Sequence, residues 1–232
     1  MENPPGRMIR SRGRIMFRKS LFVKNRDVFI AILAVVLFAP LFIFRRLGPL
    51  DFWWWMSANL VLLIGVGTAI DHGYIPSLAL DLKSGLGRKI FLGAVSAAGL
   101  YVVFWAGNGM VRQIFSFAGT GITGVYEYKS GASLSRIVLL LALVIGPGEE
   151  LFWRGFLQRR WQVRFGAVPG LLAAAALYTL VHLGSGNPIL ILAAAVCGLF
   201  WGALYLRTGS ILLVAVSHTL WDLAVFIFFP FS

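Results

Sequence analysis

Two adjacent acids, Glu149 and Glu150, lie at the end of an apolar run in a chain that has only nine Asp and Glu residues. Placing an ionisable group in hydrocarbon costs about 2.5–3.5 kcal/mol on insertion scales, so this pair is expected to have a functional or structural role. On a helix the two side chains diverge by about 100°, and Arg154 follows Glu150 by one helical turn. One carboxylate can therefore face a cavity as a general base while the other pairs with Arg154.

Two later segments place polar residues in apolar surroundings in the same way. His218 and Asp222 are four residues apart, so on a helix they share a face and the carboxylate can orient the imidazole or join it in a site. Tyr178 and His182 have the same spacing. Buried acids and histidines of this kind point to proton-transfer chemistry.

If these residues form one site, they must lie at a similar depth in the membrane. At about 1.5 Å of rise per residue, Glu149 lies roughly 15 Å and His182 roughly 21 Å from the inner boundary of its helix. Asp222 and His218 lie roughly 18 Å and 12 Å from the same side by this measure. The spacing predicts a shared site in the middle third of the bilayer, built from three helices.

The composition requires an integral membrane protein. The chain has 232 residues, of which 59% are hydrophobic and 13% are charged, against about 25% charged in soluble domains. Its net charge of +12 does not indicate nucleic-acid binding, because eight of the 21 Lys and Arg precede the first apolar run. Such an arm is typical of a cytoplasmic anchor attracted to anionic lipid. The single cysteine, Cys197, excludes an intrachain disulfide and a zinc site built from several cysteines.

The elements that must position the site are apolar runs of about 17–25 residues, the length that crosses a bilayer as a helix. We predict an all-α polytopic transmembrane helix bundle of about seven spans with the active site inside the membrane. A Gly-rich outer loop is expected over 108–134. The predicted spans are 28–44, 52–70, 90–107, 135–158, 168–184, 188–206 and 211–229.

The distribution of charge predicts how the bundle is oriented. With the N-terminus in the cytoplasm, 16 of the 21 Lys and Arg fall on the cytoplasmic side and 5 on the other. We expect three parts: a basic cytoplasmic arm (1–27), N-terminal helices with the outer loop (28–134) and a catalytic helical core (135–232).

The polar residues, taken in order, resemble the motifs of the CAAX-protease and bacteriocin-processing family of intramembrane endopeptidases. This chain has Glu149-Glu150-x-x-x-Arg154, then Tyr178-x-x-x-His182, then His218-x-x-x-Asp222. The family pattern is EExxxR, FxxxH and HxxxN or HxxxD. The resemblance covers roughly 135–229 and implies a membrane protease that hydrolyses a peptide bond of a membrane-associated peptide or protein.

The resemblance also implies roles for the residues. Glu149 would activate water together with His182, and Glu150 would pair with Arg154. His218 and Asp222 would stabilise the oxyanion or orient the peptide. The family has been interpreted both as metal-dependent and as glutamate-based, so the cofactor is either none or a divalent metal such as zinc.

Two positions depart from the common form of the family. Tyr178 stands where Phe is usual, and its hydroxyl needs a partner if it is buried. Asp222 stands where many members have Asn, and an ionised carboxylate repels an oxyanion that an amide would stabilise. Asp222 must therefore be protonated, orient His218 or bind a cation.

Two other classes of function fit the same polar residues. A membrane immunity or scaffold protein would keep the fold without turnover, and a small transporter could use buried acids and histidines as a proton relay. A scaffold protein has no need for both glutamates and both histidines, and no inverted repeat in the sequence suggests a transporter. The excess of Arg over Lys suggests a bacterial protein of the inner (plasma) membrane, whose substrate could be a bacteriocin leader or a C-terminal sorting segment.

Overall fold

The chain forms a bundle of membrane-length helices, as the sequence predicts. A computed structural model describes the backbone of residues 9–231 and the side chains of residues 26–231. In this described part, six helices are long and apolar enough to cross a membrane. The number is seven if 118–129 and 134–165, which meet at an angle of 91°, together count as one span. The predicted all-α polytopic fold is confirmed, and the protein is an integral membrane protein.

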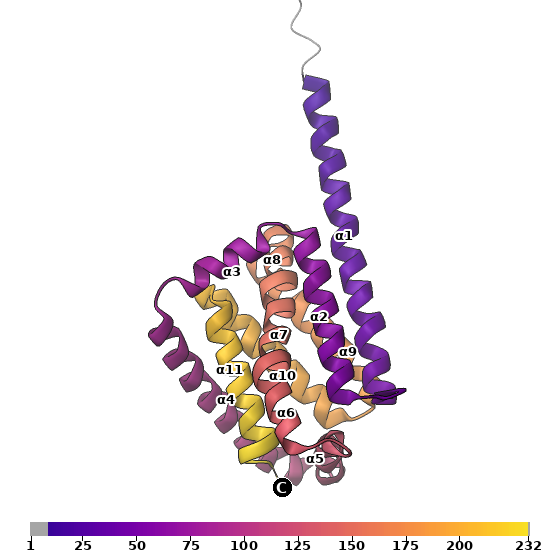
Figure 1. Cartoon of the computed structure of the whole chain (residues 1–232), viewed down its shortest axis with the longest axis vertical. Coiled ribbons are helices and arrows are strands. Elements are labelled where there is room, and N and C mark those ends of the chain that lie inside the picture. The colour runs from indigo at the N-terminus through magenta and orange to yellow at the C-terminus, as the bar shows by residue number, and fades with distance from the viewer. Residues whose placement is uncertain (1–8, 232) are drawn as a thin grey trace, which may run out of the picture.

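The first helix is longer than the predicted span of 28–44. Helix α1 runs without interruption over Ile9–Phe44 and extends far beyond the rest of the bundle (Figure 1). Its section from Arg26 to Phe44 is long and apolar enough to span a membrane. The basic arm was predicted to end where the helix begins, but 9–27 are helical as well; residues 1–8 of the arm lie outside the described residues.

Short elements connect the next spans. The strands β1 (Arg46–Leu47) and β2 (Leu50–Asp51) pair antiparallel and lead into α2 (Phe52–Ile70), whose first turn is capped by the Asp51 carboxylate. Helix α3 (Tyr74–Leu82) precedes the long α4 (Leu86–Ile114).

The predicted outer loop 108–134 is largely helical. Helix α4 continues to Ile114, and α5 (Ala118–Tyr126) with the 3-10 turn η1 (Glu127–Lys129) follows it. Glycines at this end weaken helix propensity but do not prevent a helix that packs on neighbours. Gly121 illustrates this packing, because a Cβ there would meet the side chain of Ile189 at 2.5 Å.

One long helix, from Leu134 to Phe165, carries the acidic pair. It consists of α6 (Leu134–Leu140), η2 (Leu141–Ile145), α7 (Gly146–Glu150), η3 (Leu151–Gln158) and α8 (Arg159–Phe165), where η2 and η3 are π-helical. The prediction ended this span at residue 158, but the helix continues because Arg159, Arg160 and Arg164 pair with acids of neighbouring elements.

The last three spans bring the histidines into the bundle. They are α9 (Ala167–His182), followed by the turn η4 (Leu183–Ser185), then α10 (Pro188–Thr208), and finally α11 (Ile211–Leu223) with its π-helical extension η5 (Ala224–Phe228). Helix α9 packs mainly on α10 and α8, and α11 packs on α4 and α7. In Figure 1, α3 and α8 lie at one end of the bundle, and α5 and the C-terminus lie at the other.

Candidate active site

The acidic pair lies where the helix that carries it departs from α-helical geometry. Segments η2 and η3 are π-helical and flank the five residues of α7, which include Glu149 and Glu150. π-Helical turns are rare and are frequent at functional sites. Gly146 lets this helix approach α11 closely, because a Cβ there would meet Thr219 Oγ1 at 2.5 Å. The acidic pair is therefore held directly against the helix that carries His218.

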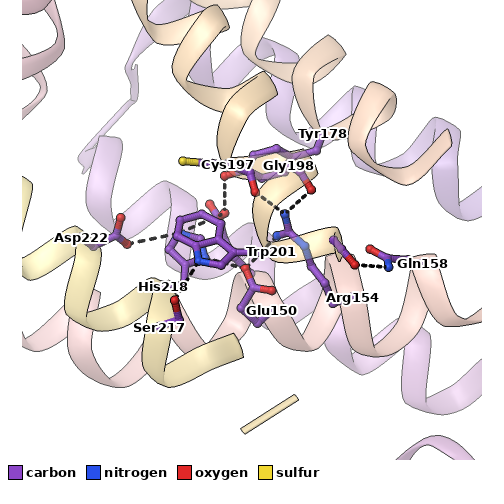
Figure 2. Close-up of polar contacts among 12 residues, drawn as sticks. Glu150, Arg154, Gln158, Tyr178, Cys197, Gly198, Trp201, Ser217, His218 and Asp222 are labelled. Carbon is purple, nitrogen blue, oxygen red and sulfur yellow. Dashed lines mark hydrogen bonds and ion pairs between the residues drawn. The ribbon is translucent and has the colours of Figure 1, made fainter. Parts of the chain in front are cut away.

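Glu150 is the buried centre of an ion-pair network (Figure 2). Its Oε1 atom accepts a hydrogen bond from Arg154 Nη1 at 2.7 Å and lies 2.6 Å from Nδ1 of His218. The guanidinium also donates to the backbone carbonyls of Cys197 and Gly198 at 3.4 and 3.3 Å. Glu150 is fully buried and Arg154 is 2% exposed. These two residues therefore tie α7, α10 and α11 together.

Glu149 contacts Tyr178 of α9. The Tyr178 hydroxyl donates to Glu149 Oε2 at 2.9 Å, and His182 Nδ1 lies 2.7 Å from the backbone carbonyl of Tyr178. A carbonyl oxygen only accepts, so Nδ1 of His182 carries a proton and Nε2 of the neutral ring is free to accept one. Glu149 and His182 are thus two proton acceptors linked through one tyrosine.

His218 connects the two glutamates. While its Nδ1 faces Glu150, its Nε2 lies 3.5 Å from Asp222 Oδ2 and 3.9 Å from Glu149 Oε2. The indole of Trp201 stacks on the imidazole, with ring centroids 3.6 Å apart and an angle of 20° between the planes. Carboxylates lie near both nitrogens of the imidazole, and the indole of Trp201 covers one of its faces. These contacts hold His218 in a single orientation.

The polar residues border a cavity of about 180 Å³. Glu149, His182, His218 and Asp222 all line this cavity, as does Tyr178, and the rest of the wall is almost entirely apolar. Glu150 and Arg154 belong to the layer behind the wall, since they do not line it. All six sequence-predicted residues are therefore brought together, four at the cavity and two behind it.

The charges of this cluster nearly balance. Glu149, Glu150 and Asp222 supply three carboxylates, and Arg154 and His218 supply two positive charges when the imidazole is protonated. Three negative and two positive charges leave a net charge of −1, which one further proton neutralises. Since an uncompensated charge is costly inside a membrane, the cluster is suited to hold and release a proton.

The donor set does not fit a resident metal ion. Among the side chains described from residue 26 to 231, no three His, Cys, Asp or Glu residues are grouped so that they could hold one. Nδ1 of His182 is bonded to a backbone carbonyl and Nδ1 of His218 to Glu150, which leaves Nε2 of each ring for contacts in the cavity.

Comparison with known families gives an independent result for this part of the chain. Residues 131–224 match the family described as type II CAAX prenyl endopeptidase Rce1-like. The Rce1-like match spans the long helix from Leu134, α9, α10 and α11, and so includes all six predicted site residues. No curated protein and no solved structure matches the chain.

Trp201 contributes to the site and was not predicted from the sequence, because an aromatic residue in a membrane helix usually has only a packing role. The hydroxyl of Tyr178 was expected to need a partner if buried, and its partner is the carboxylate of Glu149. Both residues act on predicted site residues, namely His218 and Glu149.

Proposed function

We propose that this protein is an intramembrane endopeptidase that hydrolyses a peptide bond of a membrane-associated protein by water activated at Glu149 and His182. One observation carries the proposal: Glu149 and His182, buried in the bundle and linked through Tyr178, border the same cavity. A scaffold protein would need neither group, and membership of 131–224 in a protease family supports hydrolysis over transport.

The residues suggest how the hydrolysis proceeds. Water in the cavity loses a proton to the Glu149 carboxylate, with His182 Nε2 as the second acceptor, while its oxygen forms a bond to the peptide carbonyl carbon. The tetrahedral intermediate then collapses as the C–N bond breaks. The proton that left the water passes to the leaving amine, so the products are a carboxylic acid and an amine.

His218 is the group that stabilises the oxyanion. His218 lines the cavity, and a protonated imidazole offers an N–H donor there. The carboxylate of Asp222 lies 3.5 Å from Nε2 of His218 and orients the ring, a role that an ionised Asp can fill at this position. Glu150 and Arg154 hold the other side of His218.

The cellular setting follows from the sequence. The excess of Lys and Arg at the N-terminal end supports insertion with the N-terminus in the cytoplasm of a bacterial inner membrane. The basic arm (1–27) attracts anionic lipid at that face. The arm is a membrane anchor and not a nucleic-acid site.

The substitution Glu149→Gln tests the proposal. It removes the base but keeps the shape and an oxygen that can accept from Tyr178, so cleavage of a candidate membrane substrate is expected to fall by about 10²–10⁴-fold. The measurement is the rate of product formation by mass spectrometry in proteoliposomes. Lys83→Gln, which changes an exposed charged residue at the opposite end of the bundle from the cavity, is the control and is expected to cleave normally. Unchanged cleavage by Glu149→Gln would refute the catalytic assignment.

Metal dependence is tested separately. Incubation of the wild-type protein with a strong chelator is expected to leave the cleavage rate unchanged, because the described side chains provide no three-ligand group. Loss of cleavage with chelator, and recovery on adding zinc, would show instead that carboxylates and imidazoles of the site are metal ligands.

A further inference from the structure

The cavity that borders the site extends toward one end of the bundle only. On α2 its wall consists of Phe52, Trp53 and Met56, the first turns of the helix at the α5 end. On α9 it consists of Tyr178 and His182, the last turn, which lies at the same end. The residues of α11 and η5 that line the cavity also lie toward this end, since they begin at His218 and continue to the C-terminal part.

Exposure changes along the cavity in the same direction. The wall residues at the site are buried, with Glu149 at 4% and His218 at 3% exposure. Tyr126 of α5 and Phe226 of η5, at the other end of the wall, are only half-buried. The mouth of the cavity is therefore formed by α5, η5 and the start of α2.

The opposite end of the bundle is closed behind the site. Arg154 and Gln158 follow Glu150 along the long helix, are 2% and 1% exposed, and are bonded to backbone carbonyls of α10. Tyr74 of α3 is fully buried and donates to the carbonyl of Leu151. A substrate that approached from the α3 and α8 end would meet these packed layers.

Charge determines which end faces the cytoplasm. The helical part of the basic arm (9–27), the turn between α3 and α4, and α8 lie at the closed end (Figure 1). Among the described residues, the segments at the end with the mouth carry five Lys and Arg: Arg45, Arg46, Arg112, Lys129 and Arg136. The positive-inside rule therefore assigns the closed end to the cytoplasm. The mouth then faces the other side of the membrane.

We propose, as an extension of the proposed endopeptidase function, that the substrate enters the site from the non-cytoplasmic side of the membrane. The substrate is an apolar peptide segment of an exported or membrane-inserted protein, because the wall between mouth and site is aromatic and aliphatic. One cation borders the mouth, since Lys129 lies 4.9 Å from the ring centre of Tyr126, whereas the charge of Arg45 is paired with Glu127 at 3.3 Å. Lys129 favours an acidic or carboxylate flank on the substrate over a basic one.

A native cysteine in the cavity allows access from each side of the membrane to be measured by chemical labelling. Cys197 is the only cysteine, is 3% exposed and lines the cavity beside the site. A membrane-impermeant, positively charged methanethiosulfonate reagent is applied to the full-length protein in right-side-out and in inside-out vesicles. Attachment to Cys197 is measured by intact mass. Labelling is expected in right-side-out vesicles and is expected to be lost in inside-out vesicles.

Two variants that also carry Cys197→Ala identify which end of the bundle the reagent reaches in each kind of vesicle. Thr123→Cys adds an exposed thiol on α5, at the mouth, and Lys83→Cys adds one at the closed end. Thr123→Cys is expected to label in right-side-out vesicles and Lys83→Cys in inside-out vesicles. Cys197→Ala alone should not label at all.

Each other outcome overturns the proposal. Labelling of Cys197 from the same side as Lys83→Cys would show that the cavity opens at the other end, and labelling of Thr123→Cys from the cytoplasmic side would reverse the orientation. Absence of Cys197 labelling from both sides would show a cavity closed to both. Since labelling does not require turnover, repeating it on Glu149→Gln separates this proposal from the proposed activity.

Discussion

Tyr178 contributes two different groups to the candidate site. Its hydroxyl donates to Glu149 and its backbone carbonyl accepts from His182, so one residue sets the positions of both proposed bases. The ring is held in turn by Trp153, at 5.2 Å between ring centroids, and by the guanidinium of Arg154, 5.0 Å from its centre. The phenylalanine that is usual in the family would keep the ring contacts and lose the hydrogen bond.

Tyr178→Phe is therefore expected to lower kcat and leave KM nearly unchanged. A hydrogen bond to a charged group contributes about 1.5–3 kcal/mol, which corresponds to a loss of about 10- to 100-fold. Steady-state kinetics on a membrane substrate measures the effect. Tyr74→Phe, which also removes a buried hydroxyl but one that does not line the cavity, should leave kcat intact. Equal loss in both variants would assign Tyr178 a general packing role.

The two glutamates are expected to differ in what their loss does to stability. Glu150→Gln leaves the buried Arg154 without its counter-charge, a change that costs about 3–5 kcal/mol. Glu149→Gln keeps its contact with Tyr178 and should unfold close to the wild-type temperature. Thermal unfolding in detergent, followed by intrinsic tryptophan fluorescence, distinguishes them. Equal unfolding temperatures would contradict the assignment of Glu150 to the ion-pair network.

At the scale of elements, close helix contacts determine where the polar residues meet. The pair α8–α9 is joined by Gly166 at φ +95°, a conformation that favours glycine. The two helices then approach so closely that a Cβ on Gly170 would lie 2.4 Å from the backbone nitrogen of Gln162. This contact fixes α9, and with it Tyr178 and His182, relative to the helix that carries Glu149.

Gly170→Ala is expected to destabilise the protein by about 1–3 kcal/mol, since backbone atoms cannot move aside as a flexible side chain would. Gly99→Ala is the matched control, because a Cβ there meets nothing within 4 Å. The unfolding temperatures of the two variants provide the comparison. A neutral Gly170→Ala would show that α8 and α9 can separate without cost.

At the scale of the whole molecule, most basic residues lie at one end of the bundle and the mouth of the cavity lies at the other. Arginines of α8 are tied to neighbouring elements through acids: Arg160 pairs with Asp27 at 2.7 Å and Arg159 with Asp71 at 2.6 Å. The mouth of the cavity lies at the other end. Orientation in the membrane therefore decides which proteins can reach the site.

Replacing the eight Lys and Arg of the first 26 residues by Gln should weaken this orientation. The expected result is a mixed population, in which part of the protein carries its N-terminus on the outer side. Protease accessibility of an N-terminal tag on intact spheroplasts measures the fraction inverted. An unchanged topology would show that the remaining basic residues at that end are sufficient.

The sequence by itself determined the class of fold. Runs of apolar residues long enough to cross a bilayer leave few alternatives to helices, because every backbone polar group in hydrocarbon must be bonded internally. It also determined that Glu150 and Arg154 can pair, since residues four apart on a helix are neighbours. The Rce1-like match over 131–224 agrees with the resemblance that these motifs carry.

Only the tertiary structure decided how the helices rotate toward one another. Helical spacing alone cannot tell which glutamate faces the cavity, and the contacts of α9 and α11 assign Glu149 to the cavity and Glu150 to His218. The stacking of Trp201 on His218 joins two helices that are adjacent in the chain but whose relative rotation has no local signal. The physical reason is that burial of apolar surface is non-directional, whereas hydrogen bonds and close packing select one arrangement among many.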